Sequence, residues 1–241
     1  MSASTQGRIG TALALLIMAA WTALHVAGVF FIDLGNGAQW LTALLMVILL
    51  IWLSVGLYIV AHDAMHGSLW PGQRRAGDAI GTLALWLYAG FSYRRLLPKH
   101  QSHHRHPGST DDPDFAPETP HRALAWYGRF MKTYLGRREM LGIAARALVY
   151  LLLGAKLQNI LLFFALPGLL SSFQLFYFGT FLPHRHAQDG STPPFADHHR
   201  ARSNEFGYLW SLLSCFHFGY HHEHHLQPGL PWWRLPGARR R

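Results

Sequence analysis

Apolar and polar stretches alternate along this chain in long blocks. Residues 9–32 and 40–61 are apolar runs of more than twenty positions, each long enough to cross a hydrocarbon core of about 30 Å as a helix. Between them, 33–37 is a polar turn that lacks Lys and Arg. The pattern predicts two antiparallel membrane helices. No small-residue cleavage site follows the first run, so we interpret it as a retained helix and not as a signal peptide.

A second hydrophobic hairpin is predicted further along the chain. Residues 140–155 and 160–183 are apolar, and a polar segment, 156–159, lies between them. The turn falls in this polar segment, with Pro167 bending the returning helix, or it falls at Pro167–Gly168. The sequence therefore predicts one all-α integral membrane domain over 1–241, with four crossings at about 9–32, 40–61, 140–155 and 160–183.

Two other segments are expected at the membrane surface. Residues 78–91 are apolar but short, and 126–138 mix aromatic with basic side chains, which is typical of an in-plane amphipathic segment. Residues 107–120 are rich in Pro, Asp, Gly and Thr and predict an extended loop.

Composition agrees with a membrane protein. The 241 residues are 50% hydrophobic and only 14% charged, against about 25% charged in soluble domains. The net charge of +9 does not indicate nucleic-acid binding, because the basic residues lie between and after the apolar runs, as the positive-inside rule predicts. The C-terminal Arg239–Arg241 is expected to face cytoplasmic lipid headgroups. A single cysteine, Cys215, excludes an intrachain disulfide and a cysteine-based zinc site.

Three histidine clusters stand beside the apolar runs, at 62–66 (HDAMH), 100–104 (HQSHH) and 221–225 (HHEHH). Residues three or four apart share a helix face, so we expect each HxxxH or HxxHH to turn its imidazoles toward one point. Imidazole is a ligand for mid-series transition metals, and eight nitrogens exceed the needs of one ion. The clusters predict two metals in a polyhistidine site at the membrane surface.

Other metal chemistries fit the pattern less well. A zinc peptidase would carry HExxH, whereas position 63 is Asp. A metal transporter would need ligands within its crossings, where we find His25 alone and expect it to be a satisfied core or lipid-edge residue. Bis-histidine haem uses two ligands and leaves most of the clusters unexplained. Two ferrous ions that activate dioxygen for attack on a lipid C–H bond account for all three clusters.

The wider strings resemble a known family. They are AHDAMHGS at 61–68, KHQSHHRHPG at 99–108, DDPDF at 111–115, FGTFLPHR at 178–185 and FHFGYHHEHHLQPGLPWWRLP at 216–236. These strings are similar to those of the bacterial beta-carotene ketolases, in the membrane fatty-acid desaturase and hydroxylase superfamily. The resemblance implies a di-iron, oxygen-dependent enzyme that oxidises C4 and C4′ of beta-ionone rings.

The resemblance also implies a ligand set. Its eight core members are His62, His66, His100, His103, His104, His221, His224 and His225. A ninth is expected near the end of the last crossing, where His184 fits best and His217 is the alternative. Asp63, Asp112 and Asp114 are expected to orient ligating imidazoles, or else to be loop and cap residues. The remaining histidines are expected to be surface or supporting residues: His106, His121, His186, His198, His199 and His222.

Aromatic side chains near the histidines suggest a substrate site. They are Phe91, Tyr93, Phe176, Tyr177, Phe181, Trp232 and Trp233. A long polyene needs an apolar tunnel, although an interfacial aromatic belt explains several of these residues equally well.

The expected reaction inserts oxygen at C4 twice, after which the geminal diol loses water, so that beta-carotene becomes echinenone and then canthaxanthin. Each insertion consumes dioxygen and two electrons. The chain has no GxGxxG motif, so a separate ferredoxin-like donor is expected. The donor would meet basic residues that also satisfy the positive-inside rule: Arg94, Arg95, Arg129, Lys132, Arg137 and Arg138.

A carotenoid 3-hydroxylase, an acyl-lipid desaturase and a membrane metal transporter are the alternative functions. The expected location is the bacterial inner membrane, with the site on the cytoplasmic side.

Overall fold

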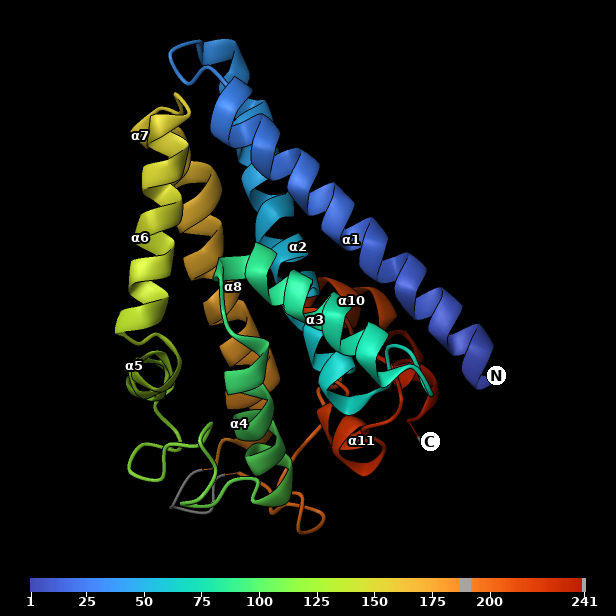
Figure 1. The fold of residues 1–241 in the computed structure, drawn as a ribbon. Helices are drawn as coiled ribbons and strands as arrows, with labels where there is room; N and C mark the ends of the chain where they lie inside the picture. The colour runs from blue at the N-terminus through green and yellow to red at the C-terminus, as the bar shows by residue number, and fades with distance from the viewer. Residues whose placement is uncertain (187–191, 240–241) are drawn as a thin grey trace.

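The computed structural model describes residues 1–186 and 192–239, and all regular secondary structure in this part of the chain is helical (Figure 1). A long hairpin comes first, made of α1 (Ala3–Phe31) and α2 (Trp40–His66), with a short 3₁₀ turn at Gly37–Gln39 before α2. The predicted first pair of helices is therefore present. α2 continues beyond its apolar run, so the first histidine cluster forms the last turn of the same helix.

Two shorter helices follow α2. They are α3 (Arg74–Ala89) and α4 (Tyr93–Arg105), which carries the second histidine cluster. α3 packs closely on α2, because a Cβ at Gly81 would lie 2.7 Å from the Ala64 Cβ. Only glycine permits this approach, and the approach brings the chain leading into α4 against the end of α2.

The second half of the bundle begins with α5 (Ala123–Tyr134) and α6 (Arg137–Leu152). A long helix then runs over Leu157–His184. Its parts are α7 (Leu157–Ile160), a π-helical turn (Leu161–Ala165), α8 (Leu166–Phe176), a second π-helical turn (Tyr177–Phe181) and α9 (Leu182–His184).

Pro167 does not end this helix. Proline has no N–H for the carbonyl four residues earlier, which is that of Phe163. His25 from α1 donates its Nδ1–H to that carbonyl at 3.1 Å, and its Nε2 accepts from the Tyr150 hydroxyl at 2.8 Å. His25 is therefore a buried, satisfied core residue, as expected.

The turn of the second hairpin lies between α6 and α7, in the first of the two places considered, where Gly154 has φ +90°. Lys156 at this turn forms an ion pair with Asp33 of the α1–α2 turn, with 3.1 Å between Nζ and Oδ1. The two turns are therefore neighbours at one end of the bundle, as Figure 1 also shows.

Three helices of the described chain are long and apolar enough to span a membrane: Ala3–Phe31, Gly37–His66 and Leu157–His184. The expected crossing at 140–155 corresponds to α6, which has 16 residues and is therefore about 24 Å long, shorter than the hydrocarbon core. The structure thus establishes an all-helical fold with three candidate spans, and the fourth crossing stays a prediction.

The C-terminal segment folds against the end of the bundle opposite the two turns (Figure 1). It contains α10 (Tyr208–Cys215), α11 (His221–Leu226) and a 3₁₀ turn at Trp232–Gly237. α11 carries the third histidine cluster and lies near α4 and the C-terminal end of α2. Of the basic tail, Arg240 and Arg241 lie outside the described residues.

Candidate metal centre

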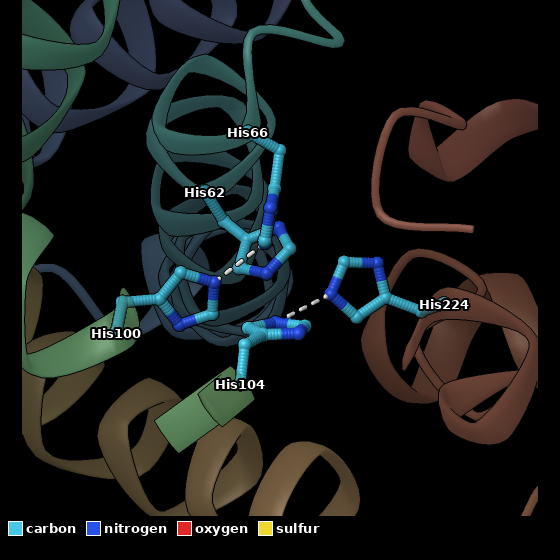
Figure 2. Close-up of side chains that lie close together, drawn as sticks. All are labelled: His62, His66, His100, His104 and His224. Carbon is cyan, nitrogen blue, oxygen red and sulfur yellow. Dashed lines mark hydrogen bonds between the residues drawn. The ribbon is translucent and has the colours of Figure 1, made fainter. Parts of the chain in front are cut away.

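Nine buried or partly buried imidazoles gather where α2, α4, α9 and α11 meet. They form two groups, and within each group the candidate ligand atoms all lie within 4.8 Å of one another. The five-histidine group consists of His62, His66, His100, His104 and His224, and Figure 2 shows its rings converging from three helices. The four-histidine group consists of His103, His184, His221 and His225. Together the two groups contain the nine candidate ligands named from the sequence.

The two HxxHH clusters do not each face one point, which corrects our expectation. On α4, His100 and His104 join the five-histidine group while His103 joins the other group. On α11, His221 and His225 stay together in the four-histidine group and His224 joins the first. Residues i and i+4 share a face, but adjacent residues are about 100° apart on a helix of 3.6 residues per turn. Each HxxHH therefore serves two sites, and α4 and α11 link them.

The nitrogen separations fit shared metal ions. The Nε2 atoms of His66 and His100 are 2.7 Å apart, and those of His104 and His224 are 3.1 Å apart. In the four-histidine group, His221 Nε2 lies 2.9 Å from His184 Nε2 and 3.1 Å from His225 Nε2. Two nitrogens bound at right angles, each about 2.1 Å from one ion, would be about 3.0 Å apart.

One unpaired ring nitrogen points to the same conclusion. His62 Nε2 is buried without a hydrogen-bond partner among the described residues. A buried polar atom without a partner is costly, and a metal bound in the five-histidine group would supply the missing interaction.

Electrostatics keep the α11 imidazoles neutral. Burial, followed by the neighbouring imidazoles, holds the pKa values of His221, His224 and His225 well below the usual histidine range. A neutral ring retains the lone pair that a metal needs.

Outer hydrogen bonds orient two members of the four-histidine group. His103 donates its Nδ1–H to Asp112, whose two carboxylate oxygens are each 3.0 Å away. The backbone N–H groups of Gly108 and Asp114 hold the same carboxylate at 2.8 and 2.9 Å. His184 donates its Nδ1–H to the Arg200 carbonyl at 2.7 Å. These bonds leave Nε2 of each ring facing the group, which is the usual arrangement around a metal-bound histidine.

The Asp112 contact also affects protonation. Burial lowers the pKa of His103, but the charge and hydrogen bond of Asp112 outweigh burial and raise it. Burial raises the pKa of Asp112, and the His103 charge outweighs it and lowers the pKa. Asp112 therefore both orients the His103 ring and raises its pKa.

Asp63 and Asp114 were expected to orient ligating imidazoles or else to be loop and cap residues, and neither of them hydrogen-bonds an imidazole. Asp63 Oδ1 is 3.8 Å from His62 Nδ1, and Asp63 Oδ2 accepts from the Trp232 backbone N–H at 3.1 Å. Consecutive helix residues point in different directions, so Asp63 fixes the C-terminal segment instead. Asp114 Oδ2 is 3.8 Å from His103 Nδ1, and its other oxygen accepts from the Tyr134 hydroxyl. Burial raises the pKa of Asp114 to about 6.

The alternative ninth ligand, His217, lies outside both groups. Its ring is fully buried against Tyr208 and Trp232, with ring centroids 4.5 and 6.1 Å away. His184 is the histidine that the fold places beside His221.

A mainly apolar cavity of about 250 Å³ opens beside both groups. His62 and His100 of the five-histidine group and His103 and His221 of the four-histidine group contribute to its wall. The aromatic residues of the wall include Tyr58, Tyr88, Phe130, Tyr134, Phe164 and Phe218. An apolar cavity in contact with a metal-binding group is the expected form of a site for a hydrophobic substrate.

Most aromatic residues predicted to bind substrate do not line this cavity. Of the seven, Phe91 does, whereas Tyr93 donates its hydroxyl hydrogen to Asp78 at 2.7 Å. Phe176, Tyr177 and Phe181 belong to a separate aromatic cluster around Trp126.

The two C-terminal tryptophans are also used in packing. The Trp232 ring centroid lies 5.1 Å from that of Phe216. The Trp233 ring packs against Gly10, where a Cβ would come within 2.9 Å of the ring and still closer to the Leu69 carbonyl oxygen. Their position near the histidines in sequence reflects packing of the C-terminal segment.

Helix spacing would have revealed some of the residues that sequence reasoning missed. Tyr58 is one turn before His62 and shares the face that continues to His66. Phe218 is three residues before His221. Tyr88 and Phe130 carry no such signal, because they come from helices that hold none of the nine imidazoles. Phe164 carries none either, because it lies twenty residues before His184 on the long helix.

Comparison with known proteins agrees with this geometry. The family model for fatty acid desaturases matches residues 38–146 and 135–241, which include all three histidine clusters. Beta-carotene ketolase from Paracoccus sp. strain N81106 is 52% identical over 224 residues, covering 92% of this chain and 89% of that protein. The chain belongs to the fatty acid desaturase family, among the beta-carotene ketolases.

Other relatives of this ketolase-family chain show the same relationship. Beta-carotene ketolase from Paracoccus sp. strain PC1 is 48% identical over 233 residues, covering 96% of this chain and 93% of that protein. Zeaxanthin 4-ketolase from Chlamydomonas reinhardtii is 40% identical over 238 residues, covering 95% of this chain and 53% of that longer protein. No solved structure matches the chain.

Proposed function

We propose that this protein is an oxygen-dependent, di-iron carotenoid ketolase that converts beta-carotene through echinenone to canthaxanthin. The observation that carries the proposal is the placement of two adjacent imidazole groups against one apolar cavity, in a chain that belongs to the ketolases. When bound, two ferrous ions supply the activation of dioxygen, which side chains cannot provide.

The protein's own residues hold and shield this site. Asp112 and the Arg200 carbonyl fix the ring orientation of His103 and His184. The surrounding helices bury His62, His221, His224 and His225, so bulk water is kept away from them. A site with fixed ligands that excludes bulk water would favour oxidation of a bound hydrocarbon over side reactions with water.

The cavity suits one ring of a carotenoid. Its volume of about 250 Å³ exceeds the roughly 150 Å³ of a protein cavity known to accept benzene, so a methylated six-membered ring fits. The polyene must then extend out of the cavity, toward the apolar helix surfaces.

C4 is allylic to the ring double bond, which weakens its C–H bonds. A second insertion at the same carbon gives a geminal diol that loses water to leave the ketone.

Electrons must come from outside the chain. Each insertion consumes two electrons and one dioxygen, and we propose a reduced ferredoxin-like protein as the donor. Of the six basic residues considered for its contact, Arg95 faces Glu139 at 3.6 Å and Arg129 faces Glu118 at 3.1 Å. We therefore assign the contact to the exposed Arg94, Lys132, Arg137 and Arg138, which are free to meet an acidic partner.

We further propose a multi-pass arrangement in the bacterial inner membrane, with α6 as a short fourth crossing. The histidine groups lie at the end of the bundle opposite the Asp33–Lys156 pair. Arg94, Arg95, Lys99 and Arg105 accompany the histidines on or near α4. The positive-inside rule assigns this end to the cytoplasm.

Expression in bacteria that accumulate beta-carotene tests the reaction. We expect echinenone and canthaxanthin by chromatography, with pigment conversion dependent on oxygen. Hydroxylated carotenoids alone, or altered fatty acids with unchanged carotene, would assign the protein to 3-hydroxylation or acyl desaturation. Metal analysis of the purified protein separates these oxidases from a metal transporter, because we expect iron to remain bound to both groups during turnover.

A further inference from the structure

A third cluster of metal-ligand side chains lies outside the nine-histidine centre. The candidate ligand atoms of Asp197, His198 and His199 all lie within 4.8 Å of one another. These residues belong to the segment that connects α9 to α10, and none of them is needed by the mechanism described above.

The cluster is held in place by the fold. Asp197 Oδ1 accepts the His199 backbone N–H at 2.9 Å, and Asp197 Oδ2 faces His222 Nε2 at 2.9 Å. The His198 and His199 rings lie with centroids 4.1 Å apart. A carboxylate with imidazoles is a common ligand set for ferrous iron and other divalent transition metals, and here two hydrogen bonds already orient the Asp197 carboxylate.

Solvent reaches this cluster more easily than the buried groups. The side chains of His222 and Asp197 are 23% and 30% exposed, whereas the members of the four-histidine group are all buried. A hydrated ion can therefore exchange some of its water for these ligands at the protein surface.

The cluster is also connected to the inner centre. The His199 ring centroid lies 6.0 Å from that of His225. His222 is on α11, where its neighbours His221 and His224 belong to the inner groups. The next residue after His199, Arg200, holds His184 through its carbonyl.

We propose that Asp197, His198, His199 and His222 form an outer site for a divalent metal ion, through which ferrous iron passes to the four-histidine group. A ligand set at the surface replaces part of the hydration shell first, and the adjacent His225 then offers the next imidazole. This role concerns metal uptake and holds whatever substrate the enzyme oxidises.

The test counts bound metal in the full chain. Purified protein in detergent is stripped with a chelator, titrated with cobalt(II), passed through a desalting column and analysed for metal. We expect His199→Ala and Asp197→Asn each to bind one equivalent less than wild type, because each removes a ligand of the outer site only. His121→Ala, which alters an exposed loop histidine, is the matched control and should bind as wild type does. Asp197→Asn also preserves side-chain size, so its result does not depend on a folding defect.

A second measurement follows ferrous iron uptake into the stripped protein over time. We expect both variants to fill the inner groups about tenfold more slowly and to reach the same inner iron content. Equal cobalt stoichiometry in wild type and both variants would overturn the outer site. A loss of more than one equivalent in His199→Ala would overturn it too, by making His199 an inner ligand, and unchanged uptake rates would overturn the transfer role. None of these outcomes depends on whether carotene is ketolated.

Discussion

The two histidine groups use similar ligands but are supported differently. The four-histidine group is buried throughout, and hydrogen bonds that His103 donates to Asp112 and His184 donates to the Arg200 carbonyl orient these two rings. In the five-histidine group, His66 and His104 are only partly buried, and helix geometry does most of the positioning. His62 and His66 come from α2, and His100 and His104 from α4, as two pairs with i and i+4 spacing.

The two groups therefore illustrate two ways of positioning metal ligands, by helix spacing and by outer hydrogen bonds. A pair at i and i+4 on a rigid helix is preorganised by the backbone alone. His103 and His184 enter the four-histidine group without such a pair, and an outer partner fixes the ring of each, while His221 and His225 of that group are again a pair at i and i+4. The four-histidine group should therefore depend on residues that never touch the metal, whereas the five-histidine group should depend mainly on the ligands themselves.

We expect the largest effect from replacing one of the nine candidate ligands. His184→Ala should remove metal from the four-histidine group and lower ketone formation by more than about 100-fold, as should alanine at any of the other eight ligands. Iron content of the purified protein and pigment analysis measure both effects.

His217→Ala is the control for this prediction. Its ring packs against Trp232 outside both groups, so the variant should lose thermal stability and keep its iron. An iron-depleted, inactive His217→Ala beside a fully active His184→Ala would show that His217 is the ninth ligand.

Asp112→Asn should weaken metal binding without removing a ligand. The amide no longer provides the charge that holds His103 in orientation, and loss of such a partner typically costs about 10- to 100-fold in metal affinity. Competition with a chelator of known affinity measures the change, which should be confined to one of the two ions.

Asp63→Asn is the matched comparison, because Asp63 is also buried and adjacent to a ligand. Asp63 accepts a hydrogen bond from the Trp232 backbone N–H, and its oxygen nearest to an imidazole is 3.8 Å from His62 Nδ1, so metal affinity should stay near that of wild type. If Asp63→Asn lowered the metal affinity as much as Asp112→Asn, the conclusion that Asp112 orients a ligand and Asp63 does not would be wrong.

Partial chelation compares the groups directly. A chelator should reach the ion beside His66 and His104 first, since these rings are partly exposed. We therefore expect a half-loaded intermediate that keeps the ion of the four-histidine group. Mössbauer spectra of iron-57 protein during chelation should show one ferrous signal fading before the other, and simultaneous loss of both would contradict the difference in access.

The sequence predicted the grouping of histidines correctly wherever the spacing along one helix determines which side chains lie together. Spacing at i and i+4 identified His62 with His66, and His221 with His225, because a helix face is a local property. The division of each HxxHH between two groups depends on where α4 and α11 sit relative to each other, which spacing does not encode. His184 was named from the resemblance, which implies a ninth ligand, and from its place directly after the last predicted crossing.

The aromatic residues show the same limit. Phe130 and Phe176 pack against each other in the aromatic cluster around Trp126, with ring centroids 5.4 Å apart, yet of the two Phe130 alone also lines the cavity. Their roles are set by tertiary packing. The fourth crossing is a similar case. α6 has the expected composition, but a helix of 16 residues is shorter than the hydrocarbon core, so whether it crosses depends on packing against its neighbours and on local thinning of the bilayer.

The smallest predicted effect concerns the cavity that both groups share. A Cβ at Gly168 meets nothing within 4 Å, and Gly168 is part of the cavity wall. Gly168→Leu should therefore place its side chain in the space proposed for the ring and raise the KM for beta-carotene about tenfold. Iron content and thermal stability should not fall, because leucine is the better helix former.

Gly142→Leu provides the matched control, since Gly142 also lies in a helix with open space around its Cβ but is exposed and does not line the cavity. Its kinetics should resemble those of wild type. Equal KM values for the two leucine variants would mean that the ring does not bind in this cavity. A loss of iron in Gly168→Leu would mean instead that the cavity wall supports the histidine groups, which would make the five-histidine group as dependent on its surroundings as the four-histidine group.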